Sequence, residues 1–471
     1  MEEVSIKKNF IYKSILTISN YLINFITFPY VSRVLGVEYI GLVNFVDNTV
    51  NYFLLFATLG INILGVREIA SVKDNLSERN KIFSNLVGMN IVFTIFTLLV
   101  YWICIIAIPQ LNQYEELFYI GSAKILFTTF LMEWFFTGIE NFRYITLRTL
   151  LIKSLYVILV FIFIRSPEDY KIYFIMTVGI VVINALINTA YIQKFVTVNI
   201  RELFARTFYQ KNIMLGIYSI MGSMYLTFNV MYLGFVSNNI EVGYYTTAFK
   251  LYSVILGFFS AFTNVMLPRM SSLLSSGNKD SFQRMANKSF LLISTFSIPM
   301  IVCSIILAPQ LVYVLSGEGY EGAVLLMRII MPAVLFVGIA QILAIQILTP
   351  MKKDKVLLFA SIIGASIALI LNLSIVSSMH SIGTAIVLLC SEFAVTTVYI
   401  IYIMRHKIIE IPFSSIWYNM LLLVPYACAC LICQYLIKNP FILLIIAVSI
   451  NGFIFTVIYR FTAKSLYRKD L

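Results

Sequence analysis

The chain has 471 residues, of which 60% are hydrophobic and only 12% are charged. Soluble domains carry about 25% charged residues, and a soluble fold could not bury this much apolar surface. The composition therefore excludes an ordinary soluble protein and predicts one that lies in a membrane. Only helices or a closed barrel can cross a bilayer, because the backbone must satisfy its own hydrogen bonds there.

The apolar runs predict helices. They reach or exceed the roughly 18 residues that a crossing helix needs, and they do not alternate with period two as barrel strands do. In chain order, these runs cover residues 10–32, 41–63, 82–108, 116–138, 144–164, 172–195, 213–236, 244–266, 289–315, 323–349, 355–377, 381–403, 417–437 and 440–460. We therefore predict an all-α polytopic membrane protein with fourteen transmembrane helices. No loop is long enough for a separate domain, so the function must lie among the helices.

The net charge of +12 would suggest nucleic acid in a soluble protein. Here the positions of the basic residues indicate topology instead. With the N-terminus in the cytoplasm, most of the 34 Lys and Arg residues fall in the tails and even-numbered loops, and few fall in odd-numbered loops: Arg33, Arg165, Lys171 and Lys438. Basic residues accumulate on the cytoplasmic side of a membrane. We expect both termini to be cytoplasmic and no nucleic-acid partner.

Cysteine placement gives no sign of a metal site. The six cysteines lie in apolar runs without a His or carboxylate beside them, at positions 104, 303, 390, 428, 430 and 433. We interpret them as small buried hydrophobes and expect neither a metal nor a cofactor.

Polar stripes suggest an internal repeat. In the second predicted helix, Asn44, Asn48, Asn51 and Thr58 share one face, and a similar stripe recurs roughly 200 residues later in the eighth helix. Six helices followed by six similar ones would form two parallel bundles. We expect bundles at 1–212 and 213–410, and two appended helices with a cytoplasmic tail at 411–471. Chance similarity between two amphipathic helices is the alternative.

The first predicted helix carries a further stripe that includes Lys13, Asn20 and Asn24. A polar face toward lipid is costly, so such stripes line either a cavity or a hydrogen-bonded helix contact. We favour a central cavity between the two bundles.

We assign six charges to the interior of the membrane, at Asp47, Lys124, Glu133, Lys250, Arg328 and Glu392. Each costs about 2.5–3.5 kcal/mol at the bilayer centre on insertion scales. Arg328 and Lys13 could extend to the membrane surface, and Lys124 and Lys250 could pair with Asp47 or Glu133. In a cavity, the basic residues would suit a phosphate or diphosphate, and the amides would suit sugar hydroxyls. The predicted substrate-binding residues are Lys124, Lys250, Arg328, Lys13, Asn20, Asn24, Asn48 and Asn51, and the candidates for ion coupling are Asp47, Glu133 and Glu392.

Five short motifs carry a family resemblance. They are FPYVSRVLGVEYIGLVNF (28–45), LGINILGVREIA (59–70), EWFFTGIENFRYITLR (133–148), MYLGFVSNNIEVGYYTTAFKLY (231–252) and LPRMSSL (267–273). In this order the chain resembles the Wzx-type oligosaccharide flippases of the multidrug/oligosaccharidyl-lipid/polysaccharide exporter superfamily.

The resemblance implies a bacterial cytoplasmic-membrane exporter rather than an enzyme. Such a protein moves an undecaprenyl-diphosphate-linked oligosaccharide from the inner to the outer leaflet, for O-antigen, capsule or other surface polysaccharide. The resemblance also implies two six-helix bundles around a cavity that opens alternately to either side. The partners that it implies are membrane lipids, a polysaccharide polymerase and a chain-length regulator. Its motif residues at helix ends would shape or gate the cavity: Arg33, Gly36, Arg67, Glu68, Gly138 and Glu140.

Other functions stay open at this point. A multidrug or cation antiporter of the same superfamily would need an acidic cavity, whereas the intramembrane charges here are evenly divided. A membrane glycan polymerase or glycosyltransferase would need a large or acidic external loop, and RSPEDYK (165–171) is the only acidic candidate. A flippase for a peptidoglycan precursor would differ only in head group.

Overall fold

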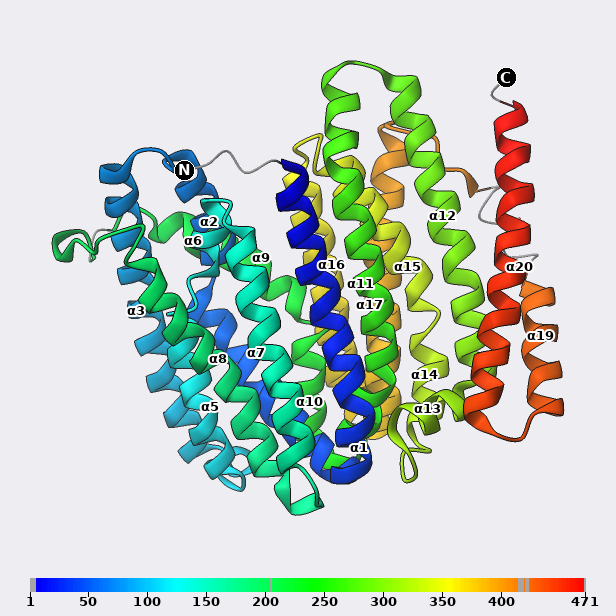
Figure 1. Cartoon of the computed structure of the whole chain (residues 1–471), viewed down its shortest axis with the longest axis horizontal. Helices are drawn as coiled ribbons and strands as arrows, with labels where there is room; N and C mark the ends of the chain where they lie inside the picture. The colour runs from blue at the N-terminus through cyan, green and yellow to red at the C-terminus, as the bar shows by residue number, and fades with distance from the viewer. Residues whose placement is uncertain (1–5, 204–205, 414–418, 420–422, 470–471) are drawn as a thin grey trace. The chain divides into compact units, whose positions relative to one another are not determined.

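The computed structural model describes residues 6–203, 206–413, 419 and 423–469, and all regular structure among them is helical (Figure 1). The chain divides into two compact units, Met1–Val242 and Gly243–Leu471. The all-helical prediction is therefore confirmed for the described residues.

The first unit contains ten α-helices and two short 3-10 turns before the start of α11. They are α1 (Ile6–Thr58), α2 (Ile61–Ser71), α3 (Leu76–Ala107), α4 (Pro109–Asn112), α5 (Glu115–Thr128), α6 (Glu133–Gly138), α7 (Phe142–Phe163), η1 (Pro167–Asp169), α8 (Tyr170–Ile192), η2 (Ile200–Glu202), α9 (Tyr209–Ser223) and α10 (Thr227–Val236).

The second unit begins inside α11, and two of its helices contain π-helical turns. Its elements are α11 (Asn239–Ser275), α12 (Lys279–Ile306), α13 (Ala308–Ser316), α14 (Ala323–Ile330), α15 (Ala333–Gln341), η3 (Ile342–Leu348), α16 (Asp354–Leu371), η4 (Asn372–Val376), α17 (Ser377–Arg405), α19 (Leu423–Leu436) and α20 (Pro440–Lys469).

Asparagine side chains start several of the long helices. Asn75 accepts a hydrogen bond from the Glu78 amide at the start of α3, and Asn278 does the same for the Ser281 amide at the start of α12. The first amides of a helix have no partner within it, so a side-chain oxygen that accepts from one of them favours the helix start at that residue.

Long helices of the first unit expose apolar faces. On α3 and α7, large hydrophobic side chains at helical spacing are at least half exposed: Ile95, Phe96, Leu99, Ile103, Ile106, Leu151, Leu155 and Ile158. Soluble monomers rarely expose contiguous apolar faces of this kind. A hydrocarbon environment accounts for them, in agreement with the composition.

The number of spans differs from the prediction. Among the described residues, nine helices are long and apolar enough to cross a membrane, and ten if the bent pair α9 and α10 counts as one span. The predicted fourteen is thus not confirmed. Two predicted helices, 10–32 and 41–63, form the single helix α1, and two others, 355–377 and 381–403, form the continuous helix Asp354–Arg405. The helices α5 and α19 have only 14 residues each, which is too short to count as a span.

Two helices that the sequence predicts as continuous are broken. The predicted helix 116–138 is divided into α5 and α6, and the predicted helix 213–236 is divided into α9 and α10 with a bend of 59°. At the second break, the Asn229 side chain donates to the Tyr225 carbonyl at 3.0 Å. Breaks at membrane depth need such partners for the freed backbone groups, and hydropathy alone does not reveal them.

Candidate functional site

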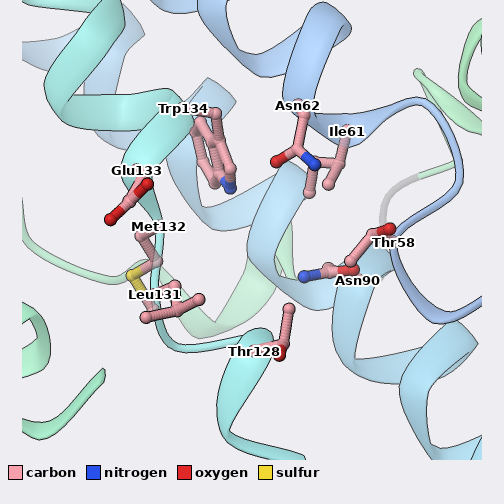
Figure 2. Close-up of a pocket in the computed structure, with 9 residues that line it drawn as sticks. All are labelled: Thr58, Ile61, Asn62, Asn90, Thr128, Leu131, Met132, Glu133 and Trp134. Carbon is pink, nitrogen blue, oxygen red and sulfur yellow. The ribbon is translucent and has the colours of Figure 1, made fainter. Parts of the chain in front are cut away.

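Two helix breaks of the first unit face one cavity. Leu59, with φ of +43°, lies between α1 and α2, and Met132, with φ of +44°, lies between α5 and α6. A cavity of about 220 Å³ lies beside both breaks, and Figure 2 shows the nine side chains that line it: Thr58, Ile61, Asn62, Asn90, Thr128, Leu131, Met132, Glu133 and Trp134. The cavity is therefore built where two helices stop and restart.

Glycines allow α2 and α6 to pack closely beside this cavity. A Cβ at Gly65 would lie 2.5 Å from the Trp134 ring, and a Cβ at Gly138 would lie 2.8 Å from the Ile69 side chain. Neither glycine has room for a larger residue, so the indole of Trp134 rests directly on the α2 backbone. This contact fixes the position of the second break relative to the first.

A buried arginine stabilises the break between α5 and α6. The Arg148 side chain, only 3% exposed, lies 2.5 Å from the Glu133 carboxylate and also donates to the Asn188 carboxamide oxygen. The Asn188 amide in turn donates to the carbonyl of Leu131, inside the break. Asn188 on α8 thus supplies a partner for one backbone carbonyl of the break, and Arg148 on α7 holds Asn188 and Glu133 in place beside it.

The cavity lining is rich in hydrogen-bonding groups. The side chain of Glu133 is 48% exposed, although Arg148 holds one of its oxygens. Asn90 is 3% exposed, and its buried carboxamide oxygen has no hydrogen-bond partner among the described residues. The hydroxyls of Thr58 and Thr128 donate to their own helices, which leaves their oxygens as acceptors. Figure 2 shows Asn62, Asn90 and both threonines around the same space.

These groups match the chemistry of a sugar ring, whose hydroxyls both donate and accept hydrogen bonds. Pockets for drug-sized ligands measure about 300–1,000 Å³. At about 220 Å³, the cavity lies below this range and is too small for an oligosaccharide.

A second ion pair lies deeper along α1. Lys124 of α5 lies 2.5 Å from Asp47 of α1, and the side chains are 11% and 24% exposed. Asn51 donates to the other Asp47 oxygen at 3.0 Å. Of the alternatives that the sequence left open for Lys124, pairing with Asp47 is the one that the structure forms.

The amides of the predicted stripe bond mainly within their own helix. Asn48 donates to the carbonyl of Asn44 at 2.8 Å, one turn earlier on α1, and Asn51 donates to Asp47. The side chains of Lys13, Asn20 and Asn24 lie outside the described ones. Whether any of these residues binds substrate stays a prediction.

The remaining predicted charges lie in the second unit. Lys250 is half-buried on α11. Arg328 on α14 is exposed, and its guanidinium donates at 3.1 Å to the carbonyl of Ile305, near the end of α12. Helix ends leave four carbonyls without partners, so this contact gives Arg328 a structural role. Glu392 is 6% exposed and accepts a hydrogen bond from Tyr252 at 3.2 Å.

The predicted motif residues lie at helix breaks and ends. Gly36 interrupts α1 with φ of +74°, and Arg33 donates to the Pro29 carbonyl one turn earlier. Arg67 is exposed on α2. Glu68 pairs with Lys211 at 3.3 Å, and Glu140 pairs with Lys73 at 3.6 Å.

Sequence reasoning missed Arg148, Asn188 and Asn90. The distribution of basic residues along the sequence groups Arg148 with those of a cytoplasmic loop, whereas the structure buries it in the second turn of α7. Asn188 and Asn90 stand alone in apolar runs, and a lone amide gives no sign of its partner. The sequence does offer a signal for Arg148, because it follows Glu133 by only 15 residues, across the short loop between predicted helices 116–138 and 144–164.

Comparison with known proteins identifies relatives of the whole chain. A family model described as "Polysaccharide biosynthesis protein" matches residues 6–274. A protein described as "Putative O-antigen transporter" from Escherichia coli (strain K12) is 26% identical over 86% of this chain and 99% of its own length. A Shigella dysenteriae protein with the same description is 26% identical over 82% of this chain and 97% of its own length. The family resemblance predicted from the motifs is confirmed.

Solved structures share the fold. The lipid II flippase MurJ in an inward closed conformation gives a TM-score of 0.75 at 15% identity, covering 97% of this chain and 99% of MurJ. An inward-facing multidrug resistance MATE transporter of the MOP superfamily gives 0.60 at 13% identity, covering 84% of this chain and 98% of the transporter. At these identities the likeness concerns the fold alone.

Proposed function

The chain belongs to the polysaccharide biosynthesis protein family, and from this membership we propose that it is a flippase and not an enzyme. Its cargo would be an oligosaccharide linked to undecaprenyl diphosphate, carried from the inner to the outer leaflet of the bacterial cytoplasmic membrane for O-antigen or a similar polysaccharide. The observation that carries the proposal is the full-length likeness to O-antigen transporter relatives.

The proposed layout has fourteen spans in two parallel six-helix bundles with two appended helices. Several features support this finer count. Gly36 interrupts α1 with φ of +74°, and His380 interrupts the continuous helix Asp354–Arg405 with φ of +48°, so each of these long helices can serve as two spans. The broken pairs α5 with α6 and α9 with α10 would each serve as one span. Both termini would then lie in the cytoplasm.

The proposed route passes through polar groups inside the bilayer. The substrate would lie in a central cavity that opens alternately to either side of the membrane. The diphosphate would be held there by Lys124, Lys250 and Arg328. The residues beside the glycan would be Lys13, Asn20, Asn24, Asn48 and Asn51. One sugar unit would enter the cavity at the α1–α2 and α5–α6 breaks, which offers carboxamide, hydroxyl and carboxylate groups.

The Lys124–Asp47 ion pair suggests how binding could be coupled to an ion. In the empty protein Asp47 neutralises Lys124. A proton or cation at Asp47 would release Lys124 for the diphosphate, and Glu133 and Glu392 are the further candidates for this role. Flipping that is unaffected when ion gradients are collapsed would remove the coupling from the proposal.

Alanine substitutions test the proposed function. In a strain without its own flippase, K124A and K250A should abolish surface polysaccharide on gels, while protein level stays normal. The matched control is K81A, because Lys81 is an exposed lysine on α3 that belongs to none of the proposed binding, coupling or gating residues. Full export by both K124A and K250A would contradict the diphosphate role, and no export by the wild-type chain would contradict the function.

A further inference from the structure

A second cavity, of about 220 Å³, lies near the turn between α11 and α12, within the second unit. It combines three basic side chains with one hydroxyl and two apolar side chains, and its lining residues are Arg269, Leu273, Ser281, Arg284, Met285 and Lys288. We name it the hairpin pocket. No described acidic side chain lines it.

The lining comes from two helix faces. On α11, Arg269 and Leu273 are four residues apart, and on α12, Arg284 and Lys288 are also four residues apart. Residues at this spacing are neighbours on a helix surface, and like charges there repel each other. Arg269 adds a third positive charge from the other helix. An anion between Arg269 and Arg284 would offset the repulsion between these two arginines.

The pocket is shaped by the turn itself. Gly277 takes φ of +71°, and the Asn278 side chain accepts from the Ser281 amide at 3.0 Å, which starts α12 directly after the turn. The Arg284 guanidinium donates to the Ser281 hydroxyl at 3.0 Å and is thereby held along the lining face. Neither Arg269 nor Arg284 forms an ion pair with a carboxylate among the described residues.

The donor set specifies the class of ligand. Guanidinium groups match the geometry of phosphate oxygens, and a lysine adds a point charge. Leu273 and Met285 add apolar surface for the first carbons of a lipid chain. Basic pockets between helices at the membrane surface bind lipid head groups. We propose that the hairpin pocket binds the phosphate of a membrane lipid.

A general excess of basic residues on one side of the membrane would not produce this arrangement. Such an excess explains how many Lys and Arg residues a turn carries, but it does not explain why three of these side chains line one cavity. Lys279 makes the distinction testable: it is the first residue of α12, exposed, and not part of the pocket lining.

Two lipids offer the same phosphate chemistry: an anionic glycerophospholipid and the diphosphate of a polyprenyl carrier. The test is native mass spectrometry of the purified full-length chain in detergent, titrated separately with phosphatidylglycerol and with undecaprenyl diphosphate. The R269Q/R284Q variant should bind at least one of them ten-fold or more weakly than the wild-type chain. The control K279Q removes one charge at the same turn and should bind within two-fold of wild type.

The outcomes separate the sources and the proposals. A loss confined to undecaprenyl diphosphate identifies the carrier lipid, and a loss for phosphatidylglycerol identifies a membrane phospholipid. Equal binding by wild type and R269Q/R284Q, or an equal loss in K279Q, would overturn the site. If the double variant does not fold, R269Q alone carries the test, since Arg269 is exposed on α11. The assay does not measure export, so failure here leaves the proposed function standing.

Discussion

At the scale of single residues, the buried charges of the first unit are explained by their partners. Arg148 pairs with Glu133, and Lys124 pairs with Asp47. A charge in hydrocarbon costs several kcal/mol unless it is paired, so each pair offsets a cost that neither residue could carry alone. The two members of a pair are nevertheless unequal, because they differ in exposure.

The Glu133–Arg148 pair predicts a large loss of stability on substitution of either residue. E133Q leaves the charge of Arg148, which is 3% exposed, without its counter-charge and should cost about 3–5 kcal/mol of stability. R148Q leaves a carboxylate that is 48% exposed, but it also removes the hydrogen bonds that the guanidinium donates to Asn188 and Thr149, so it should cost about as much. Denaturation of the purified variants in detergent measures both. R143Q, at an exposed position on the same helix, should change nothing, and wild-type stability of E133Q would contradict the argument.

Asn90 predicts opposite effects on stability and function. A buried polar atom without a partner costs about 1–3 kcal/mol, so N90L should raise the melting temperature. If the cavity holds a sugar unit, the same variant should reduce export several-fold, because the Asn90 carboxamide is one of the polar groups that line the cavity.

Asn184 supplies the control for N90L. It too is buried with an unpaired carboxamide oxygen, but it does not line the cavity. N184L should leave export unchanged. Normal export by N90L would remove Asn90 from the proposed sugar site.

At the scale of helices, the breaks decide where function can reside. Continuous transmembrane helices use all their backbone groups internally. The breaks beside Leu59 and Met132 interrupt this pattern, and the cavity lies where both occur. Asn188 from α8 bonds the Leu131 carbonyl in the second break, and Arg148 from α7 holds Asn188 and Glu133, so the cavity depends on helices that do not line it.

Gly36 predicts a purely conformational effect. Its φ of +74° and ψ of 170° lie in a region that is essentially restricted to glycine, while a Cβ there would meet nothing within 4 Å. G36A should therefore cost about 1–3 kcal/mol through backbone strain alone. Gly179 in α8 also has open space around its Cβ position but no positive φ, so G179A should be neutral or stabilise by about 0.5–1 kcal/mol. Equal melting temperatures for the two variants would argue against the break at Gly36.

At the scale of the whole molecule, the distribution of basic residues predicts orientation. The net charge of +12 arises mainly from loops and tails that the topology places on one side. The predicted topology would place the hairpin pocket on the same side, where anionic lipid would be available to it.

A pair of reporters at the C-terminus tests this orientation. Green fluorescent protein fused after Leu471 should fluoresce, because it folds in the cytoplasm. Alkaline phosphatase fused at the same position should be inactive, because it needs an oxidising compartment. A fusion after residue 168, in the loop predicted to be external, should give the reverse result. Active phosphatase at the C-terminus would overturn the predicted topology.

The membrane environment, the helical class and the family could be predicted from the amino-acid sequence. They follow from local features, such as the length of apolar runs and the order of five short motifs, which do not depend on contacts between helices. The sequence also indicated that residues such as Lys124 and Glu133 need partners, because a charge within an apolar run can be seen in the sequence. The partner of each charge, the positions of the helix breaks and the place of Asn90 beside a cavity became known from the folded structure. These depend on residues brought together from distant helices, such as Arg148 and Asn188, and no periodicity along one helix encodes the face of another.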